Sequence, residues 1–151
     1  MRRTWLQRWL VDPLEYGLMR GLFGLFGLLS PDAASNLGGW VAGTLGSLLP
    51  ATNRIRRNLA LAMPELGQAE REAIVRGTWA NLGRIVGEMP HLEAITASDR
   101  VQIDPAMLER LRAVKAEGRA MIFVGAHLSN FEVFGRAAAR SGFPQALIYR
   151  R

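Results

Sequence analysis

Residues 120–132, AMIFVGAHLSNFE, join a compact apolar run to a polar turn that holds a histidine and a glutamate. The apolar part, 120–125, has the length and composition of a strand buried in a parallel sheet. A helix is predicted to follow at 129–140, and the Ser-Gly pair after Arg140 is expected to end it. This stretch therefore predicts a strand that leads directly into a helix.

Similar signals lie on both sides of this stretch. Asp104 is placed to cap a helix predicted over 105–117, with Pro105 at its first position. Two further short strands are expected, at 100–103 (RVQI) and at 145–150 (QALIYR). This alternation of strands and helices is typical of an α/β fold in which crossover helices connect the strands of a parallel sheet.

The first third of the chain is more apolar than the rest. Residues 21–29 (GLFGLFGLL) are wholly apolar, and residues 33–53 carry no charge. A transmembrane helix needs about 20 predominantly apolar residues. The first stretch is too short for this, and the second is diluted by Ser, Thr, Asn and Gly. We expect a membrane-contacting helical hairpin or an interfacial anchor, with tryptophan rings at headgroup depth: Trp5, Trp9 and Trp40.

The glycine spacing in this region allows a second interpretation. Gly17 and Gly21, like Gly39 and Gly43, are four residues apart, which also permits close helix packing in the core of a soluble protein. The alternatives are therefore membrane-associated helices and a buried, glycine-rich helix pair.

Two more helices are predicted before the α/β pattern begins. Residues 54–63 can form a basic amphipathic helix that stops at Pro64, and the apolar periodicity that follows continues to Pro90. We divide the chain into a hydrophobic membrane-anchoring helical region, 1–53, and the N-terminal part of an α/β domain, 54–151.

The composition excludes several kinds of site. The 151-residue chain has no cysteine and two histidines, His91 and His127, so neither a thiolate site nor a multi-histidine metal site is expected. Its net charge of +6 fits an anionic partner, although an arginine-rich composition can also reflect genomic base bias. The basic residues are not interleaved with aromatic residues in one stretch, so no nucleic-acid partner is predicted.

The polar turn has a structural and a catalytic interpretation. Ser129-x-x-Glu132 fits a capping box, which explains both residues without any function. It does not explain His127, which follows the predicted strand. A histidine can act as general base on a hydroxyl, and a nearby carboxylate can fix its tautomer and stabilise the imidazolium. Because the chain lacks a Gly-x-Ser-x-Gly elbow, direct transfer to a substrate hydroxyl is the chemistry that fits.

Four blocks of sequence carry a family resemblance: RIRRNLALAMPEL at 54–66, WANLGRIVGE at 79–88, GAHLSNFE at 125–132 and LIYR at 147–150. The His-x4-Glu spacing resembles that of glycerolipid-type acyltransferases. The four blocks together resemble the bacterial lipid A late acyltransferases of the lauroyl/myristoyl type.

The resemblance implies a membrane-bound enzyme at the cytoplasmic face of the bacterial inner membrane, with no cofactor. The enzyme would move a fatty acyl chain from acyl carrier protein, or from coenzyme A, to a hydroxyl of a lipid A precursor or a similar glycolipid. His127 would be the general base and Glu132 its carboxylate partner.

In the family, further arginine and acidic residues follow the Tyr-Arg strand, whereas this sequence ends at Arg151. The chain is therefore expected to be the N-terminal half of such an enzyme. The alternatives are a catalytically inactive, membrane-associating fragment and a soluble α/β enzyme whose glycine-rich helices are core.

Overall fold

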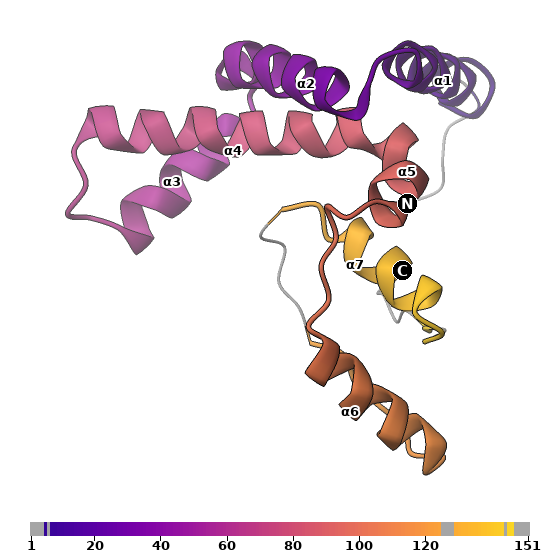
Figure 1. Ribbon diagram of the computed structural model, residues 1–151. Helices are drawn as coiled ribbons and strands as arrows, with labels where there is room; N and C mark the ends of the chain where they lie inside the picture. Colours follow the sequence, from indigo (N-terminus) through magenta and orange to yellow (C-terminus); the bar gives the residue numbers. More distant parts are fainter. Residues whose placement is uncertain (1–4, 6, 125–128, 144, 147–151) are drawn as a thin grey trace. The chain divides into compact units, whose positions relative to one another are not determined.

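The computed structural model describes residues 5, 7–124, 129–143 and 145–146. The chain forms two compact units, Met1–His91 (unit 1) and Leu92–Arg151 (unit 2), and each is described by itself (Figure 1). The predicted division into 1–53 and 54–151 concerns membrane anchoring and stays a prediction. The boundary between the two compact units lies elsewhere, after His91.

Unit 1 is helical throughout its described elements. The helices are the π-helix η1 (Gln7–Val11), α1 (Asp12–Gly27), α2 (Pro31–Leu45), the 3-10 helix η2 (Gly46–Leu48), α3 (Thr52–Ala62), α4 (Gln68–Glu88) and the 3-10 helix η3 (Met89–His91). Local signals explain several of their ends. The Ser30 side chain accepts a hydrogen bond from the backbone N–H of Ala33, and the Glu70 side chain accepts one from that of Gly67 at 2.8 Å. The helices predicted on either side of Pro64 are thereby confirmed as α3 and α4.

Glycine and alanine residues form the contact between α2 and α4, which lie side by side in Figure 1. A Cβ atom added at Gly38 would collide with the backbone of Gly83, and one added at Gly87 would collide with that of Ala34. Ala34 itself is fully buried. The missing side chains let the two backbones touch, so this crossing forms the core of unit 1.

Polar contacts attach α3 to this pair. The Thr52 hydroxyl donates to the carbonyl oxygen of Gly46 at 2.7 Å and accepts from Nε1 of Trp79 at 2.9 Å. Arg56 of α3 donates to both carboxylate oxygens of Glu72 of α4, at 2.6 and 2.9 Å.

The apolar N-terminal helices do not form the predicted hairpin. α2 packs along α4, whereas α1 contacts η1, η3 and α4. Gly39 and Gly43 do serve close packing, because added Cβ atoms would press on Arg84 and Ala80, but Gly17 and Gly21 face open space. Among the described residues, no helix is both long enough and apolar enough to cross a bilayer.

Unit 2 contains α5 (Leu92–Ala97), α6 (Pro105–Ala116) and α7 (Glu132–Arg140). The helix predicted over 105–117 is confirmed. Asp104 caps it by accepting a hydrogen bond from the N–H of Ala106 at 2.9 Å. Gly118 follows it with a φ of +70°, a conformation that glycine adopts without strain.

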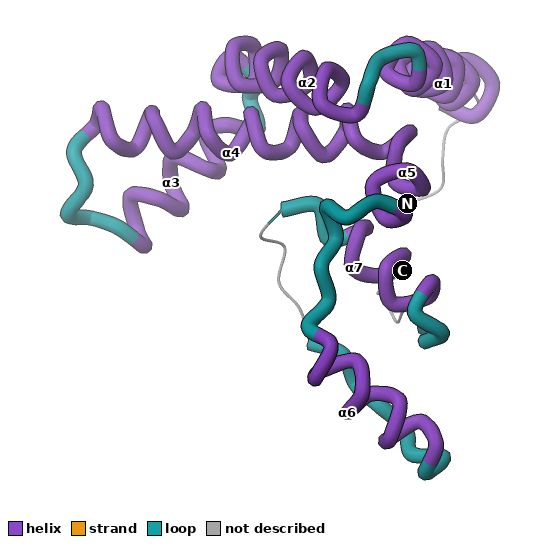
Figure 2. The backbone as a smooth tube through the Cα atoms, viewed as in Figure 1, coloured by secondary structure: helices purple, strands orange, loops and turns teal. Residues whose placement is uncertain are grey.

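The predicted α/β fold is wrong for the described part of the chain, where Figure 2 shows helices and loops and no strand. Residues 100–103 and 120–124 are turns or irregular backbone, as are 145–146, while 147–150 lie outside the described residues. Ile122 and Val124 are 92% and 91% exposed. A strand requires a neighbouring strand to pair its N–H and C=O groups, and no described segment supplies one for this apolar run.

Candidate functional site

Glu132 is the first residue of α7. The N-cap position belongs to Phe131, which makes no side-chain capping hydrogen bond. The helix predicted to begin at 129 therefore begins three residues later, and the predicted capping box between Ser129 and Glu132 is not the cap of this helix. The Glu132 carboxylate is exposed at the N-terminus of α7, where the helix dipole favours a negative charge.

The segment before α7 contacts that helix through two aromatic rings. Phe123 and Phe134 meet edge to face, with ring centroids 5.8 Å apart and ring planes at 67°. This contact ties the end of the irregular run 120–124 to α7. The predicted base, His127, belongs to 125–128, which lie outside the described residues. Of the predicted pair of His127 and Glu132, the structure therefore describes only Glu132.

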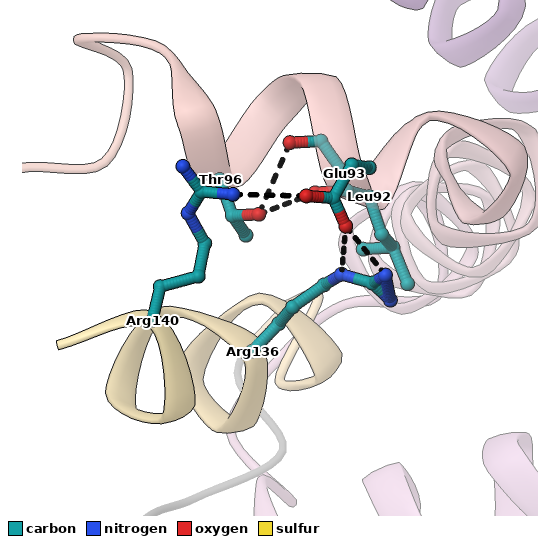
Figure 3. A network of polar contacts seen from close by, with 5 residues as sticks. All are labelled: Leu92, Glu93, Thr96, Arg136 and Arg140. Carbon is teal, nitrogen blue, oxygen red and sulfur yellow. Dashed lines mark hydrogen bonds and ion pairs between the residues drawn. The ribbon is translucent and has the colours of Figure 1, made fainter. Parts of the chain in front are cut away.

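A cluster of charged side chains fixes α7 to α5 (Figure 3). Arg136 donates from Nε and Nη2 to one carboxylate oxygen of Glu93, at 3.1 and 2.6 Å, and Arg140 donates from Nη1 to the other oxygen at 2.9 Å. The Thr96 hydroxyl lies within 2.7 Å of the carbonyl oxygen of Leu92. One carboxylate on α5 thus binds two arginines on successive turns of α7.

The far end of α7 is fixed to α6. Nζ of Lys115 donates to the carbonyl oxygen of Gly142 at 2.7 Å and lies 5.7 Å from the ring centroid of Phe143. Phe143 is 3% exposed and Ala137 is also buried. These polar contacts anchor the middle and the C-terminal end of α7, and near its N-terminal end Phe134 lies against Phe123.

Glu93, Arg136 and Arg140 were not among the predicted site residues. The sequence does carry a partial signal, because Glu132, Arg136 and Arg140 recur every four residues and so share one helix face. It carries no signal that Glu93, more than 40 positions earlier, would be their acidic partner.

Unit 1 has a separate surface groove over α2 and α4, with a volume of about 580 Å³. It is lined by small residues such as Gly39, Gly43 and Ala80 and by the larger side chains of Trp40, Arg76 and Arg84. Arg84 donates to the side-chain oxygen of Asn36 at 3.0 Å. Trp40 is 69% exposed. An amphipathic ring thus lies beside two cations on an open surface.

Comparison with known proteins identifies one family. The sequence model described as bacterial lipid A biosynthesis acyltransferase matches residues 4–151. No curated protein and no solved structure matches the chain. The match covers nearly the whole sequence, and it is to the family that the four sequence blocks resemble.

Proposed function

Because the chain belongs to the bacterial lipid A biosynthesis acyltransferase family, we propose that it moves a fatty acyl chain from acyl carrier protein to a hydroxyl of a lipid A precursor or a similar glycolipid. Acyl transfer in lipid A biosynthesis is the activity that membership of the family gives. The donor, which could also be coenzyme A, and the acceptor are the proposal. The observation that carries it is the family match over 4–151.

In the proposed mechanism His127 is the general base. Its imidazole takes the proton of the acceptor hydroxyl while the oxygen attacks the carbonyl carbon of the acyl thioester. The tetrahedral intermediate then expels the thiolate of the donor, which receives the proton back from the imidazolium. An ester forms and a thioester breaks, with no covalent enzyme intermediate.

Glu132 is the proposed partner of the imidazolium. A carboxylate that accepts a hydrogen bond from the second ring nitrogen fixes the tautomer and stabilises the positive charge. Three observations support this role: Glu132 begins α7, its side chain is exposed, and its helix is anchored to Glu93 through Arg136 and Arg140 and to Lys115 just past its C-terminal end.

We also propose that unit 1 rests on the cytoplasmic face of the bacterial inner membrane. Many of its large apolar side chains are exposed, including Trp5, Trp9, Leu14, Leu18, Leu28 and Trp40. Patches of this kind mark contact surfaces, and tryptophan suits the headgroup region. The arginines beside Trp40 would face anionic headgroups.

The experiment that tests this function is an acyl-transfer assay with the chain, acyl-loaded carrier protein and a lipid A precursor, in parallel with acyl coenzyme A. Formation of an acylated lipid is the expected result. Vesicle binding without any transfer from either donor would instead favour a non-catalytic, membrane-associating role.

A further inference from the structure

One face of α7 presents charges that would be expected to pair within the helix. Glu132 and Arg136 are four residues apart, with the acid nearer the N-terminus, which is the favourable order for an ion pair on a helix surface. If this pair formed, the guanidinium would occupy the carboxylate that the proposed mechanism assigns to His127.

The structure shows a different pairing. Nε and Nη2 of Arg136 both donate to Glu93, and Arg140 donates to the second oxygen of the same carboxylate. The side chain of Glu132 forms no hydrogen bond or ion pair with any other residue that the structure describes. Glu93 therefore takes the cation that lies closest to Glu132 along the helix.

We infer that Glu93 is a positioning residue that holds Arg136 away from Glu132 and so keeps this carboxylate available to His127. The inference rests on the proposed function. Arg140 contributes by fixing the second oxygen of Glu93, and it cannot itself reach Glu132, because eight residues of helix span about 12 Å.

Loss of the Glu93 charge has a specific consequence. Arg136 loses its partner, and the nearest carboxylate on its helix face is Glu132. An ion pair between them would draw the carboxylate toward the helix surface and occupy its lone pairs. Simple anchoring of α7 by Glu93 makes the opposite prediction for a double variant, since removing Arg136 as well could only loosen the helix further.

The test compares the kcat and KM of acyl transfer for Glu93→Gln, for Glu93→Gln combined with Arg136→Gln, and for the control Glu117→Gln, which removes an exposed partner of Arg119. We expect kcat to fall by about twofold in Glu93→Gln, because an exposed ion pair between residues four apart on a helix occupies the Glu132 carboxylate only part of the time, with KM little changed. Adding Arg136→Gln should restore most of the lost kcat, and the control should match the wild type. A double variant as slow as the single one, or a Glu93→Gln variant with wild-type kcat, would overturn the inference.

A measurement that needs no turnover separates the inference from the proposed function. The exchange of the Arg136 Nε proton with water is followed by NMR in Glu93→Gln, with and without Glu132→Gln. Protection that persists in Glu93→Gln and disappears in the double variant shows that Glu132 captures the guanidinium. Protection lost in Glu93→Gln alone contradicts the inference. Activity retained by His127→Ala would overturn the proposed function. The exchange measurement would still decide whether Arg136 pairs with Glu132 when Glu93 loses its charge.

Discussion

Gly38 of α2 and Gly83 of α4 bring the backbones of their two helices into direct contact. A Cβ on either residue would collide with the carbonyl group of the other. Both residues are buried, and the chain on either side of each is helical. The crossing therefore depends on glycine at both positions, although glycine by itself weakens a helix.

Gly83→Ala is expected to destabilise unit 1 by about 1 to 3 kcal/mol, the range found for overpacked cores. Gly77→Ala is the matched control on the same helix, because nothing lies within 4 Å of a Cβ built there. The control should stabilise the helix by about 0.5 to 1 kcal/mol. Urea unfolding followed by circular dichroism measures both, and equal effects of the two substitutions would contradict the described packing.

Thr52→Val tests the junction of α3 with the rest of unit 1. The substitution keeps the shape of the buried side chain but leaves the carbonyl oxygen of Gly46 and Nε1 of Trp79 without this hydroxyl. We expect a loss of about 1 to 3 kcal/mol in the free energy of unfolding. Thr44→Val is the control, since that exposed hydroxyl bonds to the carbonyl of Trp40 within its own helix. Similar losses for both variants would argue against a buried network at Thr52.

The ion pair between Arg56 and Glu72 gives unit 1 a pH dependence. The hydrogen bonds from Arg56 lower the pKa of Glu72, partial burial opposes this, and the nearby charges of Arg56 and Arg76 lower it further. Because the folded pKa lies below the ordinary value of 4.5, the stabilisation is present above that pH and disappears as the pH falls through the folded value.

The stability difference between the wild type and Glu72→Gln should therefore be largest near neutral pH and vanish in acid. Thermal unfolding over a pH series measures it. Glu109→Gln removes an exposed pair with Arg112 and serves as the control, with little effect expected at any pH. A difference for Glu72→Gln that stays constant into the acid range would contradict the assignment.

The groove beside Trp40 provides a test of membrane contact. Arg76→Gln should weaken binding to vesicles containing anionic lipid by about fivefold, since a cation near such a surface contributes about 1 kcal/mol. Trp40→Ala should weaken binding to anionic and neutral vesicles alike. Arg112→Gln, on α6, is the control. Binding that is unchanged in the Arg76 and Trp40 variants would show that this face does not contact the membrane.

The sequence predicted the parts of the structure that depend on nearby residues. The cap at Asp104, the stop at Gly118 and the break at Pro64 are local, and helices α3, α4 and α6 lie where these signals place them. Strands depend on partners elsewhere in the chain, so the apolar run 120–124 was a poor guide to a sheet. Close packing at Gly39 and Gly43 was one of the two interpretations of their spacing. Their partner, α4, is distant in the sequence, and the spacing of glycines does not identify it.

The candidate site divides in the same way. Glu132 could be singled out because it follows His127 at a recognisable spacing, and its place at a helix start was approximately right. Glu93 could not be singled out from the sequence, because it lies 43 positions before Arg136 and the two residues meet only in the folded chain.

The proposed catalytic role of His127 is tested most directly by one comparison. Acyl transfer from acyl carrier protein to a lipid A precursor is measured for the wild type, for His127→Ala and for Glu132→Gln, with His91→Ala as the control for a histidine that bonds the carbonyl of Phe26. We predict that His127→Ala lowers kcat by about 100-fold or more and Glu132→Gln by less, while His91→Ala retains the wild-type rate per folded molecule. Wild-type turnover by His127→Ala would contradict the account.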